Sequence, residues 1–211
     1  MNQSVLNFVA QCIGKEDVQG KRILEVGALD FNGSVRKVIS PLQPAQYIGV
    51  DIQAGPGVDE ICAAQDLIAK FGEGAFDILA STEMMEHVKP WRVILHNLKT
   101  VVRPNGLLLV TTRSKGFFYH GYPHDYWRYE IEDMQKLFSD CVIEKLEKDP
   151  RSPGVMIKAR KPVNFVEVDL NDWKLYSILH RKRVRSTNLL VEFSMRGYYG
   201  ARQLARKLLR G

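Results

Sequence analysis

The sequence has few cysteines and no long hydrophobic run. Both features limit the classes of protein to which the chain can belong. Cys12, Cys62 and Cys141 are an odd number, stand far apart and form no C-x-x-C pair. We therefore expect buried free thiols in a reducing cytosol, and neither a disulfide framework nor a zinc site. No apolar run approaches the ~20 residues that are needed to span a bilayer. Residues 1–4 lack the basic and apolar regions of a secretory signal, so a cytoplasmic protein is expected.

The charge is distributed unevenly along the 211 residues. Residues 1–173 contain 20 Lys and Arg against 23 Asp and Glu, whereas residues 174–211 contain ten basic residues and Glu192 as their one acid. The net charge of +6 therefore comes from the C-terminal end. We expect one domain over residues 1–162 and a basic, helical extension over residues 163–211.

The segment that organises the chain is an apolar run, Ile23–Val26, followed by a turn. Gly27 ends the run, and Gly33 precedes the start of a predicted helix. A strand, a glycine-containing turn and a helix start form the nucleotide crevice of a doubly wound sheet. Leu29 and Asn32 stand at the later glycines of the G-x-G-x-x-G fingerprint, so a dinucleotide is not indicated.

Glu25 and Asp51 indicate a cationic nucleoside. The carboxylate of Glu25, beside the turn, repels a pyrophosphate and suits a cation, and S-adenosylmethionine carries both an ammonium and a sulfonium. Asp51 ends a second apolar run, 24 residues after Gly27, where an acid can accept hydrogen bonds from two ribose hydroxyls. The alternatives are a strand-turn-helix without a ligand and an exposed aspartate in a turn.

Over roughly residues 20–162 the chain resembles a class I S-adenosylmethionine-dependent methyltransferase of the type 11-like group. Glu25–Gly27 resembles the opening of that family's first motif, and Asp51 its ribose-binding acid. Phe76–Val88 resembles the fourth strand with its following loop, and Arg103–Thr112 the turn and fifth strand. The order and spacing of these segments are more specific than any one motif.

The resemblance implies an α/β fold with a doubly wound, mostly parallel, seven-stranded, Rossmann-like sheet and an antiparallel last strand. Strands that alternate with helices along the chain favour the same mostly parallel sheet. The implied cofactor is S-adenosyl-L-methionine, and the residues expected to bind it are Glu25, Gly27, Ala28, Gly33, Asp51, Ile52, Ala64, Ser81 and Glu83.

The chain departs from the family pattern at two places. Leu29 and Phe31 replace frequent glycines, so the first turn must follow a longer path to Gly33. Residues 63–64 are alanines where an aspartate commonly holds the adenine amino group. Residues 65–66, a glutamine and an aspartate, are the candidates to replace that contact.

The acceptor side of the crevice is expected to contain His87 and His124. Both are candidate general bases, since histidine titrates near neutral pH and a base typically adds ~10²–10⁴-fold to a proton transfer. The alternatives are a backbone-bonded His87 at a helix start and a solvent-exposed His124. Residues 113–128 form a long loop rich in aromatics, which either line the acceptor site or pack the loop itself.

A metal site is a second possibility at the same place. Glu83, Glu86 and His87 could converge with His124 on a divalent ion through oxygen and nitrogen ligands. This resembles the E-x-x-E-H arrangement of some metal-dependent O-methyltransferases. The same pattern also occurs in relatives that use no metal, where Glu86 would only suit a helix N-terminus. We expect the version without metal.

The C-terminal extension combines an amphipathic pattern with a basic cluster at residues 181–185. Such a helix can lie on an anionic membrane, bind nucleic acid, or pack on the catalytic domain or on a second subunit of a homodimer.

The expected function is methylation of a hydroxyl on a small-molecule or sugar-containing acceptor. Proteins with a loop similar to residues 120–128 often resemble enzymes of glycan tailoring, which adds a glycan to the candidate acceptors. The alternatives are an RNA methyltransferase and a non-catalytic cofactor-binding scaffold whose tail recruits a membrane or a protein partner.

Overall fold

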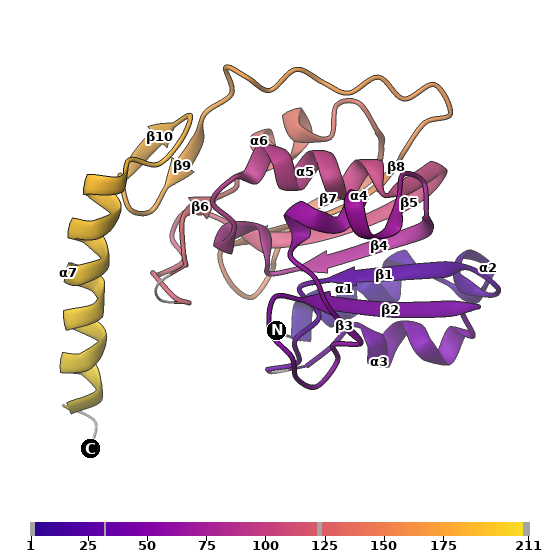
Figure 1. The fold of residues 1–211 in the computed structure, drawn as a ribbon, viewed down its shortest axis with the longest axis horizontal. Coiled ribbons are helices and arrows are strands. Elements are labelled where there is room, and N and C mark those ends of the chain that lie inside the picture. The colour runs from indigo at the N-terminus through magenta and orange to yellow at the C-terminus, as the bar shows by residue number, and fades with distance from the viewer. Residues whose placement is uncertain (1–2, 32, 122–123, 209–211) are drawn as a thin grey trace.

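A seven-stranded sheet forms the centre of the protein. The computed structural model describes residues 3–31, 33–121 and 124–208. The strands lie in the order β3-β2-β1-β4-β5-β8-β7 (Figure 1). Their bounds are β1 Arg22–Val26, β2 Gln46–Asp51, β3 Glu60–Ile61, β4 Phe76–Thr82, β5 Val102–Arg113, β7 Val142–Lys148 and β8 Gly154–Arg160. Strands β1 to β5 pair in parallel, whereas β8 runs antiparallel to both of its neighbours. The predicted fold class and the antiparallel last strand are confirmed.

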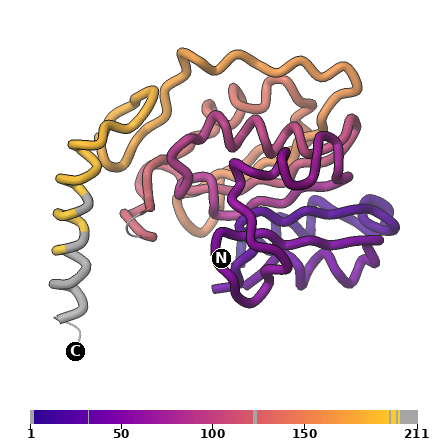
Figure 2. The backbone as a smooth tube through the Cα atoms, viewed as in Figure 1, coloured from indigo at the N-terminus to yellow at the C-terminus, as the bar shows by residue number. Residues whose placement is uncertain are grey.

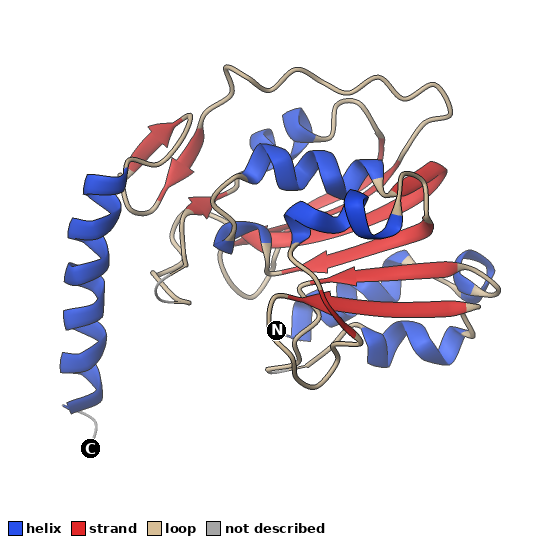
Figure 3. Cartoon of the chain, viewed as in Figure 1, coloured by secondary structure: helices blue, strands red, loops and turns tan. Residues whose placement is uncertain are grey.

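Helices cover both faces of the sheet (Figure 3). The helices of this domain are α1 Gln3–Cys12, α2 Lys15–Val18, α3 Arg36–Ile39, α4 Leu67–Phe71, α5 Trp91–Thr100 and α6 Ile131–Leu137, with 3-10 turns η1 Ser40–Leu42, η2 Ala64–Asp66 and η3 Met85–His87. The side chains of consecutive strand residues point to opposite faces of the sheet. Ile23 belongs to the hydrophobic cluster that includes residues of α1, and Leu24 to the cluster that includes residues of α5. Since successive side chains of a strand alternate, burial on both faces favours a near-continuous apolar run, which Glu25 interrupts in β1.

The C-terminal extension is only partly helical. Residues 163–174 follow an extended path along the top of the view, and then β9 Leu175–Ser177 and β10 Lys182–Val184 form a hairpin (Figure 1). Strand β9 pairs with β6, Trp127–Arg128, to complete a second small sheet. Leu175 and Leu179 are fully or almost fully buried. The expectation of a helical segment before residue 189 is therefore wrong, because pairing with a distant strand outweighs local helix propensity.

Helix α7, Leu189–Leu208, ends the described part of the extension and confirms its predicted helical character there. It stands to one side of the sheet, beyond the β9–β10 hairpin (Figures 1 and 2). Lys89 forms an ion pair with Glu192 of this helix at 2.7 Å, and the rings of Tyr119 and Tyr199 stack with centroids 4.1 Å apart. These contacts connect the first turns and the middle of α7 to the segment after β4 and to the acceptor-side loop. None of the described helices is both long enough and apolar enough to cross a membrane.

Candidate functional site

The predicted site residues lie where the parallel strands end. Strands β1, β2 and β4 point toward the edge of the sheet where β6 and the loop of residues 113–128 lie (Figure 1). In open parallel sheets this is the edge at which ligands bind.

Gly27 makes the first turn possible. Its φ of 82° lies in the left-handed region, and its N–H and that of Ala28 both donate to the carbonyl of Val50, at 2.9 and 3.0 Å. A Cβ at position 27 would lie 2.9 Å from Cβ of Met84. A side chain here would therefore be strained and crowded, whatever ligand is bound. The turn is closed onto the end of β2, and Ala28 is buried.

The path from this turn to α3 is long, as the missing glycines predict. Asp30 holds this segment through two hydrogen bonds. Its N–H donates to the carbonyl of Pro56 at 2.8 Å, and its carboxylate accepts the N–H of Gly33 at 2.6 Å. Helix α3 begins only at Arg36 and has four residues, where the sequence predicted a start at residue 34. A helix this short contributes little dipole, so the turn and the strand ends must supply most of the binding groups.

Asp51 is held at the tip of β2 by two backbone amides. Its carboxylate accepts hydrogen bonds from the N–H of Leu29 at 3.3 Å and from that of Gln53 at 3.1 Å. The neighbouring side chain, Ile52, is 61% exposed. An acid and an accessible apolar side chain thus stand side by side at the edge where a nucleoside is expected.

Glu25 is buried below the turn and is 1% exposed. It accepts a hydrogen bond from the hydroxyl of Tyr47 at 2.7 Å, and the guanidinium of Arg36 lies over the Tyr47 ring. Burial raises the pKa of Glu25 to about 7, against the opposing effects of Tyr47 and Arg36. Its charge near neutral pH therefore depends on what binds beside it.

Residues 64–66, which are expected to lie near adenine, are positioned by Asn97, a residue that sequence reasoning missed. Its amide donates to the carbonyls of Ala64 at 3.0 Å and Gln65 at 2.7 Å. Ala64 is buried, whereas the side chains of Gln65 and Asp66 are exposed. A polar residue on an otherwise apolar face of α5 was the signal that could have found Asn97.

Ser81 lies within β4, whereas Glu83 directly follows the strand. Ser81 is fully buried within the strand. Glu83 has a φ of 57°, forms an ion pair with Arg113 and accepts the hydroxyl of Thr111 at 3.2 Å. Burial and the nearby carboxylate of Glu86 raise the pKa of Glu83, while Arg113 opposes them. Glu83 is therefore already paired inside the protein.

Residues 126–129 clamp the segment that follows β4. Three hydrogen bonds reach backbone carbonyls of that segment. The N–H of Tyr126 donates to the carbonyl of Glu86 at 2.9 Å, the indole of Trp127 to that of Val88 at 3.0 Å, and the hydroxyl of Tyr129 to that of Met85 at 3.2 Å. The three rings are buried, so these aromatics pack the loop and do not line an acceptor site. Phe118, in contrast, is 63% exposed.

The structure brings His87 together with His120, not with the ring of His124. The rings of His87 and His120 have centroids 4.7 Å apart, and Nε2 of each lies 3.8 Å from the same oxygen of Glu86. The side chain of His124 is exposed, with Nδ1 3.3 Å from the hydroxyl of Tyr126. The backbone carbonyl of His124 contacts Nδ1 of His87, at 2.5 Å.

The alternative metal set of Glu83, Glu86, His87 and His124 is not assembled as four side chains, because Glu83 faces Arg113 and the His124 ring is exposed. His120 was part of a motif that the sequence singled out, but no periodicity in a loop indicates which of its histidines points inward.

A buried ion pair fixes the loop that contains His120. The carboxylate of Asp125 accepts two hydrogen bonds from Arg128, at 2.5 and 2.9 Å, and also the N–H of His120 at 2.7 Å. Burial alone would raise the pKa of Asp125, but these donors lower it below its usual value. Asp125 therefore stays ionised and holds His120 in place.

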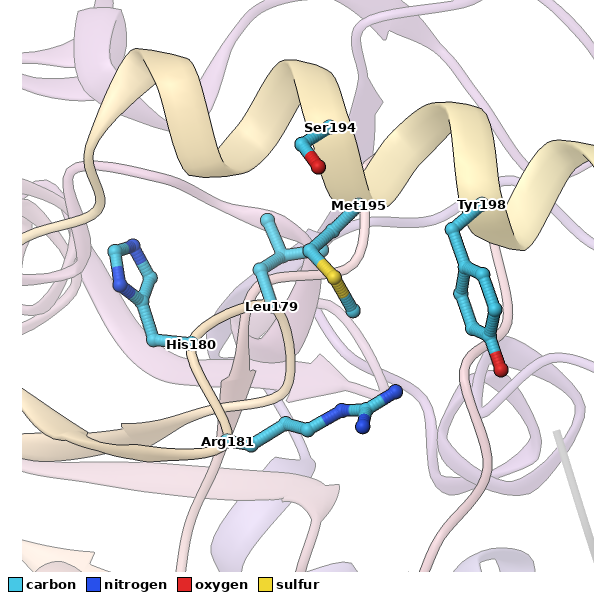
Figure 4. A pocket seen from close by; sticks show the side chains of 6 residues that line it. All are labelled: Leu179, His180, Arg181, Ser194, Met195 and Tyr198. Carbon is cyan, nitrogen blue, oxygen red and sulfur yellow. The ribbon is translucent and has the colours of Figure 1, made fainter.

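A shallow hollow of about 470 Å³ lies between α7 and the turn of the β9–β10 hairpin, away from the strand ends (Figure 4). It contains none of the predicted site residues, and its lining comes from the extension: Leu179, His180, Arg181, Ser194, Met195 and Tyr198. Burial and Lys182 lower the pKa of His180, whose Nε2 accepts the N–H of Asn188 at 3.0 Å. The hollow is a feature of the extension and not the nucleotide crevice.

The strand order and the groups at the strand ends define a nucleotide-binding α/β protein of the class I methyltransferase fold. A family model described as a methyltransferase domain matches residues 2–145, and the chain belongs to this family.

Named relatives agree with this class. The chain is 27% identical over 111 residues to a ubiquinone biosynthesis O-methyltransferase of Chromobacterium violaceum, covering 46% of this chain and 47% of that protein. It is 24% identical over 160 residues to a fatty-acid O-methyltransferase of Mycolicibacterium smegmatis, covering 70% of this chain and 53% of that protein. The chain thus spans about half the length of these curated relatives.

Solved structures show the same fold at low identity. One is a 1,6-didemethyltoxoflavin-N1-methyltransferase of Burkholderia thailandensis, with bound 1,6-didemethyltoxoflavin and S-adenosylhomocysteine. It superposes with a TM-score of 0.60 and 13% identity, over 76% of this chain and 80% of that one. At this identity the likeness shows the fold alone.

Proposed function

We propose that this protein transfers a methyl group from S-adenosyl-L-methionine to a hydroxyl of a small-molecule or sugar-containing acceptor. The observation that carries the proposal is the carboxylate of Asp51, held by two backbone amides at the end of β2 beside the exposed Ile52. A carboxylate in this position suits ribose hydroxyls, and an apolar side chain suits one face of a base.

The residues around the first turn fit the rest of this cofactor. The left-handed turn at Gly27 places backbone without a side chain at the strand end, and the buried Glu25 offers a negative charge for an ammonium group. When bound, S-adenosylmethionine supplies a methyl group on a positively charged sulfur. The chain's own part is to orient the nucleoside, to exclude water and to align the acceptor, which can contribute several kcal/mol.

The acceptor side supports oxygen as the methylated atom. Both curated relatives are named O-methyltransferases. Nδ1 of His87 donates to the carbonyl of His124, so in the neutral imidazole with no metal bound Nε2 is able to accept a hydroxyl proton. His124, whose ring is accessible, remains a proposed second participant on this side.

Incubation with labelled S-adenosylmethionine tests the proposal directly. The purified protein should label at least one fraction of a cell extract separated into small molecules, polysaccharide, lipid and nucleic acid. Asp51→Ala should reduce labelling of that same fraction. If no fraction accepts label, although the protein binds S-adenosylhomocysteine, the protein is a cofactor-binding scaffold. Label in the nucleic-acid fraction, with binding that weakens steeply as salt rises, would favour the RNA methyltransferase alternative.

For the extension we propose an anionic membrane surface as the partner. Leu189, Leu190 and Phe193, at the start of α7, are 67%, 82% and 80% exposed. Arg181 and Lys182, at the adjacent hairpin turn, are also exposed. Apolar side chains beside basic ones are the combination by which a peripheral helix binds acidic lipid. A homodimer that covers the same apolar residues is the competing outcome.

A further inference from the structure

Three side chains converge beyond the end of β4. One oxygen of Glu86 lies 3.8 Å from Nε2 of His87 and 3.8 Å from Nε2 of His120. Candidate ligand atoms of the three residues all lie within 4.8 Å of one another. Within the described ranges, no other group of three His, Cys, Asp or Glu side chains has this geometry.

The tautomer of His87 follows from its partner. Nδ1 lies 2.5 Å from the backbone carbonyl of His124, and a carbonyl can only accept a hydrogen bond. Nδ1 therefore carries a proton, and in the neutral imidazole the lone pair lies on Nε2, the atom 3.8 Å from the Glu86 oxygen. The contact uses the backbone of residue 124, so it does not depend on which side chain that residue has.

His120 is arranged in the same way by a different partner. Its Nδ1 lies 3.1 Å from the carboxylate of Asp125, which Arg128 keeps ionised. Nδ1 of His120 therefore also donates, and in the neutral imidazole the lone pair lies on Nε2, which faces Glu86. A second acceptor that fixes the ring through its other nitrogen is the usual support of a metal-binding histidine.

Glu86 supplies the third group and is fully buried. One of its oxygens accepts the hydroxyl of Thr112 at 2.8 Å. The other, the oxygen that faces both histidines, has no hydrogen-bond partner among the described residues. Two imidazole lone pairs and a carboxylate oxygen directed at one point repel one another, and a buried unpaired acceptor is unfavourable. A cation between them removes both penalties.

We propose that Glu86, His87 and His120 bind a divalent transition-metal ion. Two imidazoles and one carboxylate favour an ion such as Zn²⁺ over Mg²⁺ or Ca²⁺, which prefer oxygen ligands. Three protein donors leave at least one coordination position open. The consequence for activity rests on the proposed function: a hydroxyl oxygen of the acceptor would take that position, and coordination would lower the pKa of the hydroxyl.

Zinc titration of untagged, chelator-treated protein tests the site without any methyl acceptor. Isothermal titration calorimetry should find one Zn²⁺ per chain and much weaker binding of Mg²⁺. Glu86→Gln, His87→Gln and His120→Gln should each weaken Zn²⁺ binding at least ~10-fold. Co²⁺ absorption in the visible range should report the same site and disappear in the same variants.

Two histidine variants are the matched controls. His124→Gln keeps the backbone carbonyl that holds His87, and His96→Gln removes a half-exposed ring that pairs with Glu167 on another part of the surface. Both should bind Zn²⁺ like the unaltered protein. The proposal is overturned if the unaltered protein binds no stoichiometric Zn²⁺, if Glu86→Gln and His120→Gln retain full affinity, or if His124→Gln loses as much as His120→Gln.

S-adenosylhomocysteine binding, measured on the same chelator-treated samples, separates this proposal from the proposed function. Cofactor binding without a zinc site rejects the metal alone. A zinc site without cofactor binding rejects the methyltransferase function and leaves the metal site standing. Retained cofactor binding in the three ligand variants also shows that they are folded.

Discussion

Asp51 is the residue whose position most directly serves a nucleoside. We expect Asp51→Ala to weaken S-adenosylhomocysteine binding by roughly 1–3 kcal/mol, because charge-assisted hydrogen bonds to the ribose are lost. Isothermal titration calorimetry measures this change. Glu73→Ala is the control: Glu73 is an exposed acid just before β4, at the opposite end of the strand from the crevice. Equal losses in both variants would show that general charge, not the position of Asp51, controls binding.

Glu25 should make cofactor binding depend on pH. Burial raises its pKa to about 7, so below that pH the free protein carries a neutral carboxyl. A ligand with a nearby ammonium group favours the ionised form, so binding releases a proton in that range. Affinity for S-adenosylhomocysteine should therefore rise about tenfold per pH unit as the pH increases toward 7, and level off above it.

Calorimetry between pH 5.5 and 8, in buffers with different ionisation enthalpies, checks both the affinity and the released proton. Glu25→Gln cannot ionise and should flatten the profile. Identical affinities of the unaltered protein at both ends of the range would contradict an electrostatic role for Glu25.

The absence of a side chain at Gly121 leaves room for the ring of His87 on the acceptor side. A Cβ at this position would lie 2.6 Å from Cε1 of His87, and its φ of 64° is in the left-handed region. Gly121→Ala should cost about 1–2 kcal/mol from the backbone alone and should also displace the His87 ring. We expect turnover to fall while cofactor affinity stays unchanged, measured by initial rates and calorimetry.

Gly116→Ala is the matched control in the same loop. Gly116 also has a positive φ, of 102°, but its added Cβ would lie no closer than 3.4 Å to Pro153 and would not contact a histidine. It should therefore lose a similar amount of stability without the loss of turnover. A Gly116→Ala enzyme as slow as Gly121→Ala would show that the general stability of the loop, not His87, sets the rate.

At the scale of elements, the extension has two parts with different roles. Truncation after Asp172 removes Leu175 and Leu179, which are buried, and should reduce the free energy of unfolding by roughly 3–6 kcal/mol. Truncation after Asn188 removes only α7 and its few contacts with the domain, and should leave a cooperatively folded protein. Thermal unfolding followed by circular dichroism compares the two, and similar melting temperatures would contradict the distinction.

The same truncation after Asn188 tests the membrane partner. Full-length protein should sediment with vesicles of phosphatidylcholine and phosphatidylserine, and should do so much less with phosphatidylcholine alone, because the basic hairpin turn is attracted to acidic lipid. The truncated protein should remain in solution. Unchanged sedimentation after truncation would exclude α7 as the binding element, and a change from dimer to monomer without lipid binding would favour the homodimer.

For the whole molecule, cofactor binding should appear as increased stability. A ligand that binds only the folded state adds about 2.7 kcal/mol at 100 times its dissociation constant. For a chain of this size that corresponds to a melting temperature roughly 5–10 °C higher. Differential scanning calorimetry with S-adenosylhomocysteine measures the shift, and adenosine at the same concentration is the control. No shift with S-adenosylhomocysteine would contradict the proposed cofactor.

The sequence by itself determined the sheet, its order of strands and helices, and the positions of Gly27 and Asp51 at the strand ends. Local rules account for the strand positions and the turn, because buried parallel strands need near-continuous apolar runs and a tight turn needs a residue that tolerates positive φ, while the family resemblance implied the seven strands and the antiparallel last strand. Only the tertiary structure decided that His120, and not the ring of His124, joins Glu86 and His87. That choice depends on the clamp between residues 126–129 and the segment after β4, which are distant in sequence. The hairpin before α7 was decided in the same way, since its partner strand, β6, is about 50 residues earlier in the chain, where no local pattern can register it.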